Sequence, residues 1–145
     1  MKEVKNSARV RFPAQSENEG FARIFTAGFL MPLGITPTQL ADVKTAVSEA
    51  VTNSIVHGYR GVENRSEAYI FLDLRFYSDR TLVVTVWDRG CGIPDVEKAM
   101  QPFFTTDPES ERSGMGLPIM DAFCDSLRIT SSPRGTKVVM KKRFR

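Results

Sequence analysis

The carboxylate of Asp88, followed by two closely spaced glycines, is the group in this 145-residue sequence best placed to recognise a ligand. Gly90 and Gly92 come next, and glycine permits positive φ and has no Cβ that would hold a ligand away from the backbone. A fixed carboxylate beside such a loop can accept a hydrogen bond from an exocyclic amine, which is what adenine offers. On its own, the pattern more often marks a tight turn whose Asp caps its own backbone.

Glu49 and Asn53 form a second pair whose spacing suits chemistry. They are one helical turn apart, so their side chains lie on one face of a helix. An Asn carbonyl oxygen is a hard, neutral ligand suited to magnesium, which takes few protein ligands and keeps several waters. A Glu one turn away can orient or deprotonate a group beside that metal. An isolated pair of this kind is more often the ordinary polar flank of a helix.

A third group of residues ends a polar stretch that has no clear periodicity. We expect a loop acting as a lid from Thr105 to Gly116, and a helix after it because Pro118 fits a first turn. Bare amides at a helix N-terminus, next to Gly114 and Gly116, would make an anion site. Arg112 could reach a terminal phosphate, since a guanidinium fork matches phosphate oxygens. The alternative is a flexible loop before an ordinary helix.

Together and in this order, the three patterns resemble the motifs of the ATP-binding family shared by gyrase, Hsp90, histidine kinases and MutL. Gly135-Thr136 resembles the last small motif of that family, and the likeness covers nearly the whole chain. The resemblance implies a Bergerat fold with ATP and Mg²⁺ as cofactors, Asn53 as metal ligand, and Glu49 and Arg112 as catalytic residues. The residues that it assigns to the nucleotide are Asn53, Asp88, Gly90, Gly92, Ile93, Thr105, Gly114, Met115, Gly116, Leu117 and Thr136.

Within that family, the chain is similar to the bacterial anti-sigma factors that are also serine kinases, most of all to those of sporulation. This likeness is carried by the runs 47–53, 57–59 and 111–116. It implies a homodimeric, ATP-dependent protein serine kinase that sequesters a sporulation sigma factor and phosphorylates a serine of an anti-anti-sigma protein. Asp107 departs from the pattern, because related lids usually carry a basic residue there.

Other functions remain open from the sequence. The chain could be a stress-response anti-sigma kinase of the same family, or a nucleotide-gated binding protein without transfer activity. It could also be a detached ATP-binding domain of the histidine-kinase type, whose phosphoacceptor would lie on another chain. The sole histidine, His57, is better explained by packing or capping at a helix C-terminus.

The bulk properties indicate one domain over residues 1–145, long enough for a single sizeable core. Twenty basic and seventeen acidic residues give a net charge of +3, which is too balanced to indicate nucleic-acid binding. No apolar run approaches the roughly 20 residues of a membrane span, and no signal peptide is apparent. Cys91 and Cys124 suggest reduced thiols rather than a disulfide framework. We therefore expect a cytoplasmic protein that binds neither nucleic acid nor a membrane.

The elements that must position these residues begin with a strand over 8–13. Ser16 to Glu19 has the pattern of a capping box, which predicts a helix from there to Leu30. We expect the apolar face of this helix, formed by Phe21, Ile24, Phe25 and Phe29, to lie in the core or in a subunit interface. Glu17 and Arg23 would then remain on the outer face as partner-binding residues.

The next helix is predicted to start at Thr36 as N-cap, with Pro37 in its first position and Gln39 closing a capping box. Alternating apolar residues predict strands over 69–76 and 81–87, and a last hairpin joins 127–131 to 136–143. Strands at both ends with helices between them favour a two-layer α/β sandwich. Its sheet would be mixed but mostly antiparallel, with helices covering one face.

Overall fold

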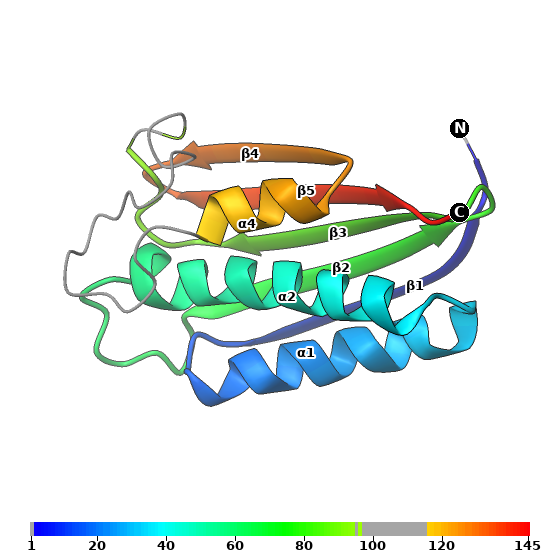
Figure 1. Ribbon diagram of the computed structural model, residues 1–145. Coiled ribbons are helices and arrows are strands. Elements are labelled where there is room, and N and C mark those ends of the chain that lie inside the picture. Colours follow the sequence, from blue (N-terminus) through cyan, green and yellow to red (C-terminus); the bar gives the residue numbers. More distant parts are fainter. Residues whose placement is uncertain (1, 95, 97–115) are drawn as a thin grey trace.

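The computed structural model describes residues 2–94, 96 and 116–145, leaving the side chain of Leu117 aside (Figure 1). The expectations for Thr105, Arg112, Gly114 and Met115 therefore lie outside the described residues. No helix in the described part of the chain is long and apolar enough to cross a membrane.

The described strands form a five-stranded sheet in the order β1-β2-β3-β5-β4. Their bounds are β1 (Val4–Pro13), β2 (Tyr69–Tyr77), β3 (Thr81–Asp88), β4 (Ser126–Ser132) and β5 (Gly135–Arg143). The expected two-layer fold is confirmed, and each neighbouring pair of these strands is antiparallel. β1 begins earlier than predicted because its mostly polar first residues still pair through their backbone with the end of β2, as Asn6 does with Phe76.

Helices cover one face of this sheet (Figure 1). They are α1 (Glu17–Leu30), α2 (Pro37–Asn53) and α4 (Gly116–Phe123), with a short 3₁₀ turn, η1 (Met31–Leu33), after α1 and a π-helical turn, η2 (Ser54–Gly58), after α2. The start of α2 confirms the predicted capping box. The Gln39 amide donates to Thr36 Oγ1 at 3.1 Å, and the Thr36 amide donates to Gln39 Oε1 at 2.8 Å.

The predicted capping box at the start of α1 is wrong. Ser16 has helical backbone angles and its side chain makes no cap hydrogen bond. Glu19 is engaged elsewhere: its Oε1 accepts a hydrogen bond from Ser48 of α2 and lies 3.3 Å from Arg23 Nε. A contact between two helices has therefore taken the carboxylate that the local pattern assigned to the cap.

Within this single chain, only part of the predicted apolar face of α1 is buried. Ile24 is 74 % exposed and Phe21 is 43 % exposed, whereas Phe29 is buried as expected. The buried side of α1 is formed by Ala22, Thr26, Phe29 and Leu30. This buried side combines the small Ala22 and Thr26 with the large Phe29 and Leu30, and Phe21 and Ile24 are left on the surface of the chain.

The core lies between the helices and the sheet, where Val47 and Val51 of α2 meet the apolar face of the central strands. The opposite sheet face carries arginines over aromatic rings, with Arg11 4.4 Å from the Tyr69 ring centroid. Asp73 is buried on that face, held at 3.0 Å by Arg9 and at 3.1 Å by Arg75.

Candidate nucleotide site

Asp88 ends β3 with its carboxylate buried, the residue being only 5 % exposed. Oδ2 accepts a hydrogen bond from Ser54 Oγ at 2.6 Å, and Oδ1 accepts one from the Gly90 amide at 2.9 Å. Thr136 of β5 is the partner of Asp88 in the sheet. The end of β3, the start of β5 and the C-terminal end of α2 all lie at one end of the molecule (Figure 1).

The bond from Gly90 is the turn cap that the simpler interpretation of this loop expected. A capped turn alone does not account for Oδ2, which faces the helix rather than the loop. The carboxylate is therefore fixed from two sides by two elements far apart in sequence. An ionised carboxylate offers about four acceptor positions, and these two bonds use one on each oxygen.

The glycines of this loop are required by contacts within the protein. A Cβ at Gly90 would collide with the carbonyl oxygen of Gly58, and a Cβ at Gly92 would collide with that of Ser132. Gly92 also has a φ of 82°, in the left-handed region. We expected these glycines to admit a ligand, and the structure gives a different first reason for them: the loop packs directly on η2 and on the hairpin.

Tyr59 also holds the loop that follows Asp88. Its hydroxyl accepts a hydrogen bond from the Arg89 amide at 2.9 Å and donates one to the Tyr69 carbonyl at 2.5 Å. The Cys91 amide adds a bond to the Gly58 carbonyl at 2.7 Å. Burial raises the pKa of the Tyr59 phenol above its ordinary value, and the charge of the nearby aspartate acts in the same direction, against the lowering effect of the Arg89 amide.

Ile93 and Thr136 are joined through a serine that the sequence interpretation missed. Ser131 Oγ accepts a hydrogen bond from the Ile93 amide at 2.6 Å and lies 2.8 Å from Thr136 Oγ1. The loop after β3 is thereby tied to the β4–β5 hairpin. The only local signal for Ser131 was its place opposite Thr136 in the predicted hairpin.

Glu49 and Asn53 occupy the last two turns of α2 as predicted. Glu49 is buried, at 8 % exposed, whereas Asn53 is half-buried and is the last residue of α2. The chain continues directly into η2, whose first residue is Ser54, the partner of Asp88. Single π-helical turns in α-helices often occur at functional sites. The last residue of α2, Asn53, is thus next in sequence to the residue whose side chain holds Asp88.

Gly116 begins α4, and the backbone of Leu117 lies in its first turn. α4 lies beside α2 on the helical face of the sheet (Figure 1). The other residues expected at the phosphates precede Gly116 and lie outside the described part of the chain.

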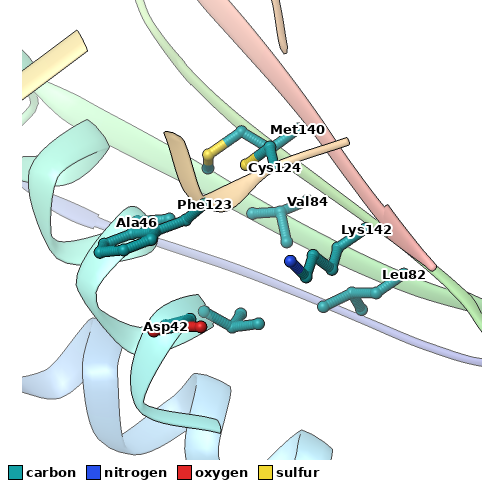
Figure 2. Close-up of a pocket in the computed structure, with 9 residues that line it drawn as sticks. Asp42, Ala46, Leu82, Val84, Phe123, Cys124, Met140 and Lys142 are labelled. Atoms are coloured by element: carbon teal, nitrogen blue, oxygen red, sulfur yellow. The ribbon is translucent and has the colours of Figure 1, made fainter. Parts of the chain in front are cut away.

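A separate pocket lies between the first half of α2, the end of α4 and the middle of the sheet (Figure 2). Its lining is Asp42, Val43, Ala46, Leu82, Val84, Phe123, Cys124, Met140 and Lys142. By the helical rise, Asp42 is roughly 16 Å from Asn53 along α2, so this pocket is distinct from the Asp88 site. Burial raises the pKa of the Cys124 thiol to about 11, although the charge of Lys142 opposes the shift.

Residues 12–142 match the model of the histidine kinase-like ATPase domain. The chain is similar to the anti-sigma F factor of Clostridium beijerinckii, with 45 % identity over 140 residues covering 96 % of this chain and 95 % of that protein. It is similar to the anti-sigma F factor of Bacillus licheniformis, with 46 % identity covering 96 % of this chain and 93 % of that protein.

Among solved structures, the chain resembles the crystal structure of the RsbU and RsbW domains of a Mycobacterium tuberculosis protein. The TM-score is 0.70 at 21 % identity, covering 96 % of this chain and 32 % of that one. At this identity the likeness supports the fold, and the two curated relatives carry the closer relationship.

Proposed function

The chain belongs to the histidine kinase-like ATPase family, and from that premise and its likeness to anti-sigma F factors we propose that it is an ATP-dependent protein serine kinase and an anti-sigma factor. It sequesters a sporulation sigma factor and phosphorylates a serine of an anti-anti-sigma protein. The ATPase domain implies that the chain binds ATP. We further propose that it binds Mg²⁺, that it transfers the phosphoryl group to serine, and that it forms a dimer.

The observation that carries the nucleotide part of this proposal is the buried carboxylate of Asp88, fixed by Ser54 and by the Gly90 amide. Both oxygens keep acceptor positions, and neither carries a hydrogen when the group is ionised. Such a group fits the exocyclic amine of adenine, which donates, and disfavours the carbonyl oxygen at the same position of guanine. The hydrogen-bond acceptors of the Asp88 carboxylate therefore fit the base of ATP.

The transfer chemistry is assigned to the end of α2. Bound Mg-ATP would supply the phosphoryl group and most of the charge neutralisation, because such transfer depends chiefly on positioning and electrostatics. Asn53 would hold the metal through its side-chain oxygen, and the buried carboxylate of Glu49 would accept the proton of the substrate hydroxyl. We further assign Thr105, Arg112 and the run 114–117 to the phosphates.

The protein partners are assigned to α1. Glu17 and Arg23 are exposed there, next to Phe21 and Ile24, which are exposed apolar side chains of the same helix. A cluster of exposed apolar residues rimmed by charge is typical of an interaction surface. In this proposal the sigma factor and the anti-anti-sigma protein compete for this surface, and the nucleotide site stays separate from it.

The test is incubation of the pure chain with labelled ATP and a candidate anti-anti-sigma protein. We expect label on a serine of that protein, and Glu49→Gln should slow the transfer by at least about a hundredfold while nucleotide binding persists. Acid treatment of the product separates the alternatives, because phosphoserine survives acid and phosphohistidine does not. Acid-labile label would favour the histidine-kinase type, and ATP binding without transfer would favour a pure binding protein.

A further inference from the structure

We propose that Ser54 is a positioning residue for base selection: its hydroxyl orients the Asp88 carboxylate so that the site discriminates for the 6-amino group of adenine. The inference rests on the proposed binding of ATP at Asp88. The sequence motifs assigned no role to Ser54. Its hydrogen bond connects the end of α2, where Asn53 is proposed to bind the metal, to the end of β3, where Asp88 is proposed to bind the base.

The geometry makes Ser54 the donor in this pair. Its Oγ lies 2.6 Å from Asp88 Oδ2, and both residues are buried, at 6 % and 5 % exposed. A hydroxyl has one hydrogen to donate, and here that hydrogen is committed to the carboxylate. Since little water reaches the pair, the bond to a charged acceptor constrains the rotation of the Asp88 side chain strongly.

The backbone of η2 explains why Ser54 can reach the carboxylate. The Tyr59 amide donates to the Ser54 carbonyl at 3.0 Å, which closes the wide turn of a π-helix. Within this turn Gly58 leaves room for the aspartate, because a Cβ there would lie only 2.9 Å from Asp88 Oδ2. The same turn accepts the Cys91 amide at 2.7 Å, so the carboxylate and the loop after it share one support.

Two bonds with different partners leave the carboxylate little freedom. Gly90 holds Oδ1 from the loop, and Ser54 holds Oδ2 from the helix. Removal of the hydroxyl leaves Oδ2 without this donor, and the side chain can turn about its bond to Cβ. The bond to the 6-amino group then weakens, whereas contacts of the ligand with other parts of the site are unchanged.

The experiment compares ATP with purine riboside triphosphate, which lacks the 6-amino group, by calorimetry on the full chain. Wild-type protein should prefer ATP. In Ser54→Ala this preference should fall by about tenfold, the weight of one hydrogen bond to a charged group, with little change in affinity for the analogue. Ser48→Ala removes a hydroxyl from the same helical region without touching Asp88, and should keep the wild-type preference.

Ser54→Cys provides a second variant that fills the space with a weak donor, and thermal unfolding checks that each variant is folded. We expect Ser54→Cys to lose most of the preference as well. A wild-type preference in either folded variant overturns the role of Ser54, and so does an equal loss of affinity for both nucleotides. A wild-type chain that binds neither nucleotide, or binds both equally, contradicts the adenine site itself instead.

Discussion

The hydroxyl of Tyr59 accepts a hydrogen bond of 2.9 Å from the backbone amide of Arg89, thirty residues further along the chain. The same hydroxyl donates to the Tyr69 carbonyl at 2.5 Å, and Tyr59 is only 6 % exposed. One buried oxygen therefore connects the segment after α2, the start of β2 and the loop that follows Asp88. This relationship makes the loop part of the folded core rather than an independent turn.

Tyr59→Phe should lower the free energy of unfolding by about 1–2 kcal/mol, because it removes both hydrogen bonds of the hydroxyl. Urea unfolding followed by circular dichroism measures the change. Tyr69→Phe is the matched control, since the Tyr69 ring packs beside Phe71 and under Arg11 on the open face of the sheet. A Tyr59→Phe protein no less stable than this control would contradict the connecting role.

The raised pKa of Tyr59 also predicts how stability depends on pH. The folded protein binds the phenolic proton more tightly than the unfolded chain, chiefly because of burial. The contribution of the neutral phenol is therefore complete below about pH 10 and is lost as the pH rises through the higher folded-state pKa. Wild-type protein should lose more stability than Tyr59→Phe between neutral pH and this alkaline range. Parallel curves of unfolding free energy against pH would refute this.

Asp88→Asn should weaken ATP binding by roughly ten- to a hundredfold. The substitution replaces one accepting carboxylate oxygen by a donating NH₂ group, which cannot bind the amine of adenine because that amine is also a donor. Asp73→Asn is the control: it neutralises another buried aspartate of the same sheet, on the face away from the helices. Calorimetry with ATP and GTP measures both. Equal affinity of wild-type protein for ATP and GTP would remove Asp88 as the selecting group.

Local patterns predicted well what local contacts decide. Thr36 and Gln39 are three residues apart, and their reciprocal cap forms as expected. Ser16 and Glu19 have the same spacing, but the Glu19 carboxylate binds Ser48 and Arg23 instead of forming the cap. A pattern of four consecutive residues contains no information about a partner on another helix. The outcome depends on how α1 packs, which also left Ile24 exposed.

The candidate site shows the same division. Asp88 at the end of a strand, and Glu49 one turn before Asn53, could be predicted from periodicity and spacing. Ser54 could not be, because its role comes from a contact 34 residues away and from a π-helical turn that periodicity does not mark. Gly90 and Gly92 lie in the loop after β3, where the sequence placed them, and their closest neighbours are protein backbone atoms.

Arg23→Glu should weaken the binding of the sigma factor and of the anti-anti-sigma protein by at least about tenfold each, since reversed charge at an interface is strongly unfavourable. ATP affinity should not change, because Arg23 lies on α1, where it forms an ion pair with Glu19 of the same helix. Arg128→Glu reverses an exposed charge on β4 and is the control. Normal binding of both proteins by Arg23→Glu would leave α1 without the proposed role.

The two thiols should differ in reactivity towards an alkylating reagent such as iodoacetamide. Cys91 is exposed in the loop after Asp88, whereas Cys124 is partly buried and its pKa is raised to about 11. Because the thiolate is the reactive form, only about one in a thousand Cys124 thiols is reactive at pH 8. Mass spectrometry of partly labelled protein should therefore find the label first on Cys91, and Cys124 should react only at strongly alkaline pH or after unfolding.

A Cys91→Ser variant leaves Cys124 as the thiol to be labelled. The labelling rate of Cys124 should rise about tenfold for each pH unit between pH 8 and pH 10, as expected for a group titrating above that range. Labelling of Cys124 at the rate of Cys91 at pH 8 would contradict the partial burial of the Cys124 thiol.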